Sequence, residues 1–233
     1  MNTQKPPLPL HEETLLLALR DDSGTADPYA NLGLGLGAAV LAELLLQERV
    51  AIETEGKKQF LRLIDDSTTG NTILDAAIGK MWDAKRRAQL VSWVQRFSAI
   101  PRLMHRTAES LCAQGVLKVE EGRVLWIFKR TIYPELDGRV EKEILERLRK
   151  AIFTQTSEIS ARTVVLASIA NSTGLLRANF DKRKLKERKV RIEKLVKGEI
   201  AGKAATEAVE AATAAIAMAV VMSAVILPTV SSS

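Results

Sequence analysis

The chain has 233 residues, with 34 Lys and Arg against 28 Asp and Glu, so its formal net charge is +6. Hydrophobic residues make up 46% and charged residues 27%, a composition typical of a globular protein and not of a disordered one. A single cysteine, Cys112, excludes an internal disulfide framework and a multi-cysteine zinc site. Because His11 and His105 are the only histidines, most histidine-based metal sites are excluded too, and we expect no metal and no cofactor.

The first part of the chain predicts two helices followed by a β-hairpin. Residues 10–20 form an amphipathic pattern with Glu12 and Glu13 in the first turn, where acidic groups suit the helix dipole. A second helix is predicted over 34–48. Apolar and polar residues then alternate over 49–53 and again over 60–64, with a turn at 55–57 between them.

The middle of the chain predicts three helices and a second hairpin. The helices cover 71–80, 84–97 and 103–113, and Thr72 with Asp75 resembles a capping box at the first of them. The hairpin is predicted as a strand over 115–119, a turn at 120–122 and a strand over 124–128. Helix plus hairpin thus occurs twice, although no residue-level repeat supports duplication.

After Pro134 every segment predicts a helix, over 139–153, 157–171, 181–197 and 203–227. Residues 211–227 are 17 uncharged residues, which leaves two interpretations, a tail anchor or a helix buried in the core. The run is shorter than the ~20 residues that a bilayer requires, so the buried helix is favoured. The first nine residues hold three prolines and no apolar run, which does not fit a signal peptide.

The catalytic motifs that we considered are absent or lack their context. Gly33, Gly35 and Gly37 look like a dinucleotide fingerprint, but a turn and not a strand precedes them, so they predict close packing at a helix start. No serine-nucleophile or P-loop motif is present, and Cys112 lies at an apolar helix position that predicts a buried thiol. We therefore expect a protein that is not an enzyme.

Positive charge is concentrated in two segments. Residues 182–197 hold nine Lys or Arg and two Glu, and residues 80–106 hold seven Lys or Arg and one Asp. Their charges of +7 and +6 exceed the net charge of the chain, which predicts an anionic partner surface, either lipid headgroups or nucleic acid. Arg102 and Arg106 have the i, i+4 spacing that places two guanidinium groups on one helix face, where they could grip a phosphate.

A helix followed by a hairpin in a basic chain also fits a winged-helix protein on DNA, which we keep as the alternative function. The helix before Gly115 is only modestly basic, and Glu120 and Glu121 in the predicted hairpin turn would repel DNA phosphates. Nucleic acid is therefore the disfavoured partner.

The segment Leu8 to Gly24 resembles the opening signature of the Golgi phosphoprotein 3 family, L-x-L-x-E-E-x-L-L-L-x-L-x-D-x-x-G. Further agreement with this family lies in Leu41-Ala-Glu43-Leu44, in Thr69-Gly70, in Gly115-Val116-Leu117 and in the segment 161–180. The resemblance covers nearly the whole chain. It implies a single, mostly helical domain with a membrane-facing hairpin and a buried C-terminal helix.

The resemblance also implies a function. Eukaryotic members bind phosphatidylinositol 4-phosphate through a tryptophan, an arginine and two helix arginines, and act as adaptors for cytoplasmic tails of Golgi enzymes. Here Pro28 and Gly37 occupy the first two of those positions, with Tyr29 adjacent, while Arg102 and Arg106 lie close to the other two. These departures indicate a divergent member and leave a prokaryotic source open.

Together these observations predict a mainly α fold, a compact domain over 8–228 with two small hairpins, and flexible tails at 1–7 and 229–233. We expect a peripheral membrane protein in the cytoplasm that binds anionic phospholipid headgroups through Arg102, Arg106 and Tyr29. An apolar wedge around the second hairpin, with Ile132 and Tyr133 exposed, would insert into the bilayer. Cytoplasmic tails of membrane proteins and a second copy of the chain are the further partners that we expect.

Overall fold

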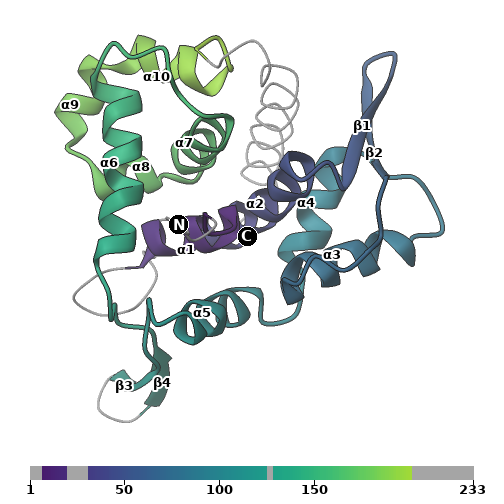
Figure 1. Ribbon diagram of the computed structural model, residues 1–233, viewed down its shortest axis with the longest axis horizontal. Helices are drawn as coiled ribbons and strands as arrows, with labels where there is room; N and C mark the ends of the chain where they lie inside the picture. The colour runs from purple at the N-terminus through teal and green to yellow at the C-terminus, as the bar shows by residue number, and fades with distance from the viewer. Residues whose placement is uncertain (1–6, 20–30, 125–127, 201–233) are drawn as a thin grey trace, which may run out of the picture.

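Two helices that are buried on all sides cross the middle of the molecule (Figure 1). The computed structural model describes residues 7–19, 31–124 and 128–200. Every residue of α1 (Leu10–Ala18) is buried, and so are twelve of the fifteen residues of α2 (Leu32–Leu46). Helices that are buried all round are typical of a protein core. Accordingly, α2 packs against α1, α4 (Leu90–Ser98) and α7 (Ala161–Thr173).

The glycines of α2 allow its close approach to its neighbours. A Cβ atom at Gly37 would lie 2.6 Å from the Val94 carbonyl oxygen and 2.6 Å from the Ser98 nitrogen, both on α4. At Gly35 it would lie 2.8 Å from the Thr173 methyl group, whereas Gly33 faces open space. The predicted close packing at this helix start is therefore confirmed for two of the three glycines.

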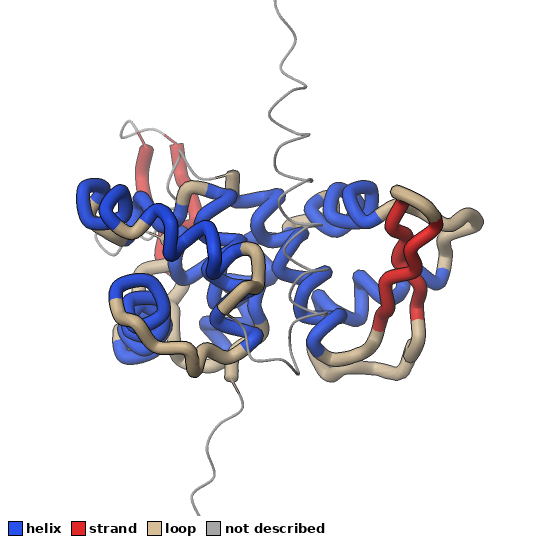
Figure 2. The backbone as a smooth tube through the Cα atoms, turned by 90° about the horizontal axis from the view of Figure 1, so that it is seen from above, coloured by secondary structure: helices blue, strands red, loops and turns tan. Residues whose placement is uncertain are grey.

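The remaining elements lie on either side of these central helices. Figure 1 places α6, α8, α9 and α10 toward one end of the long axis and α3, β1 and β2 toward the other. In Figure 2 the strands form two separate pairs far from each other. The bounds of these elements are β1 Val50–Glu55, β2 Lys58–Leu63, α3 Thr72–Trp82, α5 Leu103–Ala113, β3 Glu120–Val124, β4 Phe128–Ile132, α6 Arg139–Phe153, α8 Leu175–Asn179, α9 Lys182–Glu187 and α10 Lys189–Val196.

The first hairpin is where the sequence predicts it. Strands β1 and β2 pair antiparallel, from Val50 opposite Leu63 to Glu55 opposite Lys58. Gly56 has a φ of +58°, in the left-handed region that a tight turn requires and that glycine adopts without strain. The alternating pattern and the turn residues were enough to predict this element.

The second hairpin is shifted along the chain from its predicted position. Strand β3 contains Glu120 and Glu121, which the sequence assigned to the turn, and pairs with β4 from Glu120 opposite Ile132 to Val124 opposite Phe128. Residues 115–119 contribute only the isolated bridge of Leu117 to Glu135. The prediction was wrong because strand pairing depends more on context than on the low intrinsic β-propensity of Glu and Gly.

Several helix boundaries also differ from the predictions. Residues 84–89 are not helical, so α4 is shorter than expected, and the predicted helix over 181–197 is divided at Arg188 into α9 and α10. The cap of α3 is Asn71, whose side chain accepts from the Ile73 and Leu74 amides at 3.0 and 3.2 Å. Asp75 instead accepts from Thr69, so the capping box proposed for Thr72 and Asp75 was wrong.

The predicted fold class, mainly α with two small hairpins, is confirmed. The predicted buried C-terminal helix over 203–227 and the domain end at 228 lie outside the described residues. Among the helices that are described, none is both long enough and apolar enough to cross a membrane.

Candidate functional site

Arg102 and Arg106 lie at the beginning of α5. Arg102 precedes the helix as its N-cap with a φ of 55°, in the left-handed region that non-glycine residues rarely adopt. Its side chain is 68% exposed, and its guanidinium lies 2.9 Å from the carboxylate of Glu109. Arg106 is half-buried and donates from Nη2 to the carbonyl oxygen of Thr72 at 2.9 Å. The two guanidinium groups thus have different partners, on α5 and α3.

Tyr133 is a buried side chain at the base of the second hairpin. It is 3% exposed, and its hydroxyl lies 2.9 Å from Nδ1 of His105 on α5. Burial raises the pKa of the Tyr133 hydroxyl, and the charge of Glu109 raises it further. The predicted exposure of Tyr133 for membrane insertion is therefore wrong, because its side chain is buried and its hydroxyl contacts His105 on α5.

The other residues predicted for this site are only partly described. Ile132, the last residue of β4, is half-buried. Tyr29, the third residue of the predicted headgroup site, lies outside the described residues. Arg102 and Arg106 both lie at the start of α5, where their side chains pair with Glu109 and with the Thr72 carbonyl oxygen respectively.

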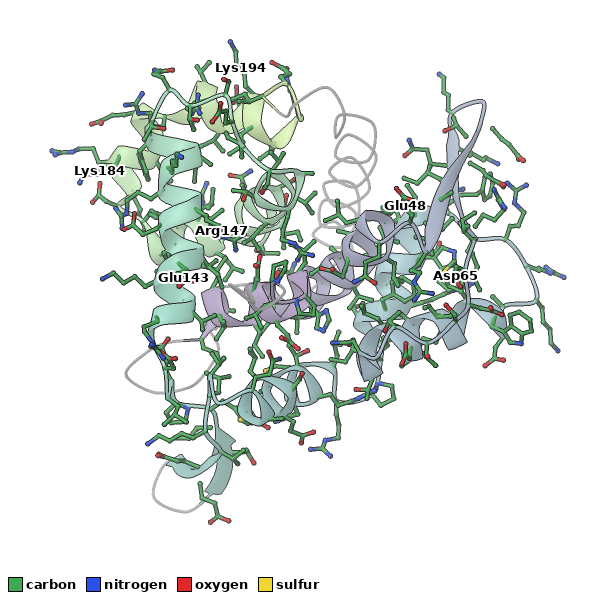
Figure 3. All side chains as sticks on the ribbon, viewed as in Figure 1. Glu48, Asp65, Glu143, Arg147, Lys184 and Lys194 are labelled. Atoms are coloured by element: carbon green, nitrogen blue, oxygen red, sulfur yellow. The ribbon has the colours of Figure 1, made fainter. Side chains whose placement is uncertain are left out.

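The acidic pair of the opening signature has a structural role. Both carboxylates are buried, with Glu12 1% and Glu13 2% exposed. Glu12 accepts from Ser110 Oγ on α5 at 2.7 Å and from Nε2 of Gln114, the C-cap of that helix, at 2.8 Å. Glu13 pairs at 2.7 Å with Arg147, which projects from α6 toward α1 (Figure 3). The sequence predicted only a helix-dipole effect here, because it does not show which distant helices supply the partners.

Burial shifts the pKa values of two titratable side chains of α1, Glu13 and His11, in opposite directions. Burial raises the pKa of Glu13, and the positive charge of Arg147 only partly offsets this. His11 is fully buried, and this desolvation lowers its pKa to about 4, so its imidazole is neutral at pH 7. These shifts arise from the burial of α1 in the core.

Cys112 was predicted to be a buried structural thiol. It is half-buried on α5, and both burial and the nearby charge of Glu109 raise the pKa of its thiol. A raised pKa leaves less of the nucleophilic thiolate at neutral pH. The environment of Cys112 therefore does not activate it as a nucleophile.

The two basic segments form separate regions of the molecule. The more basic one lies on α9 and α10, where Lys184 and Lys194 point away from the body (Figure 3). The other lies on α3 and α4, toward the opposite end of the long axis, and extends to the start of α5 near the middle (Figure 1).

The fold and these contacts define a mainly helical domain with two hairpins, in which the carboxylates of an N-terminal acidic pair connect α1 to α5 and α6. The family model described as Golgi phosphoprotein 3 (GPP34) matches residues 10–212, and the chain belongs to this family. Its α1 signature, recognised from the sequence, is thus a packing motif in the structure.

Individual relatives agree with this assignment. The chain is 24% identical over 177 residues to vacuolar protein sorting-associated protein 74 of Eremothecium gossypii, covering 68% of this chain and 53% of that protein. It is 24% identical over 210 residues to the protein of the same name from Schizosaccharomyces pombe, covering 76% and 62%. A VPS74-like protein of Dictyostelium discoideum is 25% identical over 167 residues, covering 66% and 63%.

The chain thus spans between 53% and 63% of the length of these curated relatives. All three organisms are eukaryotes, so these relatives give no support to the prokaryotic source that the sequence left open.

Proposed function

We propose that this chain is a non-enzymatic peripheral membrane protein that binds anionic phospholipid headgroups, phosphoinositides among them, from the cytoplasmic side. We further propose that it acts as an adaptor for cytoplasmic tails of membrane proteins. Membership of the Golgi phosphoprotein 3 family supports this proposal. The relatives named after vacuolar protein sorting are consistent with a role at internal membranes.

The observation that carries the lipid part of the proposal is the exposed, strained arginine at the start of α5. Arg102 has a φ of 55°, and its side chain forms no capping hydrogen bond with α5 that would offset the cost of this conformation. Strained residues of this kind concentrate at ligand sites. The start of an eleven-residue helix also offers amide N–H groups and the positive end of the helix dipole to a phosphate.

Arg106 adds a second charge within one helical turn. Its amide donates to the Arg102 carbonyl oxygen at 2.8 Å, so both residues belong to the first turn of α5. An arginine near an anionic bilayer contributes ~1 kcal/mol to binding, and salt screens this contribution. The hairpin β3–β4 projects from the body beside α5 (Figure 1), and we propose that it approaches the same bilayer with Ile132 at its base.

Co-sedimentation of the full chain with vesicles tests this proposal. Binding to phosphatidylcholine vesicles that contain phosphatidylinositol 4-phosphate is expected at low salt and not at high salt. Arg102→Ala with Arg106→Ala should weaken it, whereas Lys182→Ala with Arg183→Ala on α9 removes the same charge and should retain most of it. Absence of wild-type binding to any anionic vesicle at low salt would refute the proposal.

The winged-helix alternative gains no support from the geometry. In that arrangement α5 would face DNA, yet its exposed surface carries Glu109, which is 49% exposed, and β3 begins with Glu120 and Glu121. A winged-helix protein needs a basic recognition helix in the DNA groove, and an exposed surface with these carboxylates does not supply one.

A further inference from the structure

A basic hollow lies where α3, α4 and the segment between them meet. We call it the basic hollow. Its volume is about 430 Å³, and the residues that line it are Lys80, Ala84, Lys85, Arg86 and Arg96. Lys80 lies in the last turn of α3 and Arg96 in the last turn of α4, while the other three residues belong to the irregular segment 84–89. The sequence predicts one helix over 84–97, so it does not show the irregular segment that forms one side of this hollow.

The cations of the basic hollow are not neutralised by the described part of the chain. Within the described residues, none of the two lysines and two arginines of the hollow forms an ion pair with a carboxylate. The adjacent Arg87, in contrast, pairs with Glu53 at 2.8 Å and with Glu55 at 2.6 Å. The guanidinium of Arg96 lies 4.6 Å from the centre of the Trp93 ring, which fixes its position. The hollow therefore offers four unpaired charges to an external anion.

An exposed tryptophan lies two residues along the chain from two residues that line the hollow. Trp82 is the last residue of α3, between Lys80 and Ala84 in the sequence, and it is 70% exposed. An indole ring is apolar but carries an N–H donor, and tryptophan is enriched for this reason at the interface between bilayer and water. A soluble anion would satisfy the cations but leave this ring in water, whereas a bilayer surface would satisfy both.

We infer that the basic hollow receives the phosphate of an anionic phospholipid headgroup while Trp82 enters the interface of the same bilayer. The inference rests on the proposed membrane function but uses residues other than Arg102 and Arg106. Arg86 and Arg96 can bind phosphate oxygens through paired N–H donors, and the two lysines act as point charges. Free phosphate presents the same oxygens, so the test must separate a lipid from a soluble source.

The experiment uses the full chain and vesicles of phosphatidylcholine with and without phosphatidylserine. Lys85→Ala with Arg86→Ala should weaken binding about 25-fold at low salt, because each cation near an anionic surface accounts for about a fivefold change. Lys182→Ala with Arg183→Ala on α9 is the matched control and should retain most of the binding. In the wild type, bromine-labelled lipids should quench emission that Trp82→Phe removes.

Each other outcome has a definite meaning. Equal weakening by both double variants would show unspecific charge attraction and overturn the inference. If the Lys85 and Arg86 variant binds vesicles as tightly as the wild type while the Arg102 and Arg106 variant loses binding, the inference is overturned and the proposed function stands. No wild-type binding would refute both. Calorimetric binding of inorganic phosphate as tight as vesicle binding, and lost in the Lys85 and Arg86 variant, would assign the hollow to a soluble anion and overturn the bilayer part.

Discussion

Glu43 on α2 and Arg162 on α7 form a bidentate ion pair, with N–O distances of 2.7 and 2.9 Å. The two side chains are 2% and 18% exposed. Glu43 also accepts from the backbone N–H of Leu10 at 2.7 Å, so one carboxylate connects α1, α2 and α7. Burial opposes its ionisation most strongly, but the hydrogen bonds and charge of Arg162, with the Leu10 amide and Gln47, lower the pKa of Glu43 below its usual value.

Removing the cation of this pair should destabilise the fold strongly. Arg162→Met leaves Glu43 buried without its partner, and we expect the free energy of unfolding to fall by about 3–5 kcal/mol. Urea denaturation at pH 7 measures it. The matched control is Lys189→Met, which breaks the exposed Lys189–Glu193 pair, 76% and 54% exposed, and should change stability by about 0–1 kcal/mol.

A double variant tests whether the two charges are coupled. Glu43→Leu with Arg162→Met removes both, so no lone charge remains buried, and it should be more stable than the sum of the single effects predicts. Simple additivity would contradict the coupling.

The sequence was sufficient for elements whose signals are local. The helix over 103–113 and the first hairpin follow from periodicity and from the turn at Gly56, both of which depend on neighbouring residues only. The second hairpin failed because its register depends on pairing with β4. The division at Arg188 and the irregular segment 84–89 likewise depend on packing that a helical pattern does not record.

The site was harder to predict than the fold. The i, i+4 spacing predicts that Arg102 and Arg106 share a helix face, but the sequence could not show that Arg102 precedes α5 in a left-handed conformation or that Arg106 reaches Thr72 on α3. The burial of Tyr133 was also missed, because its partner His105 is 28 residues away in the chain. Side chains that meet from distant segments require the tertiary structure.

The glycines of α2 should respond in opposite directions to the same substitution. Gly37→Ala places a methyl group 2.6 Å from backbone atoms of α4, and we expect a loss of about 1–3 kcal/mol in the free energy of unfolding. Gly33→Ala meets nothing within 4 Å and should be neutral or stabilise the helix by up to about 1 kcal/mol. Denaturant midpoints compare the two, and equal effects would argue against the close contact.

His11 should make the fold less stable in acid. Its folded-state pKa of about 4 lies below the ordinary value of 6.5, so between these values the unfolded chain binds more protons than the folded one. The free energy of unfolding therefore falls as the pH drops through this window, by about 2 kcal/mol between pH 7.5 and pH 5.

The control for this prediction is His11→Leu, which removes the titrating group from the core. Urea midpoints at both pH values should then differ by less than in the wild type. Glu13, whose raised pKa gives a contribution of the opposite sign, is present in both proteins and does not affect the comparison. An unchanged pH dependence in His11→Leu would contradict the assignment to His11.

Arg102→Gly should make the protein more stable while weakening its binding to anionic vesicles. Glycine adopts a φ of 55° without strain, so we expect the free energy of unfolding to rise by about 0.5–1 kcal/mol. Loss of the ion pair with Glu109 offsets little of this, because both side chains are largely exposed. Denaturation and vesicle co-sedimentation on the same preparation measure the two effects.

Glu48 provides the matched control, because it is the other described non-glycine residue with positive φ, at 56°. Glu48→Gly relieves the same backbone strain at the end of α2, away from α5, as its label in Figure 3 shows. Glu48→Gly should raise the free energy of unfolding by an amount similar to that of Arg102→Gly. Its binding to vesicles should be unchanged, or slightly stronger because a negative charge is lost. If Arg102→Gly gains stability and binds vesicles as the wild type does, the strain at position 102 has no role in lipid binding.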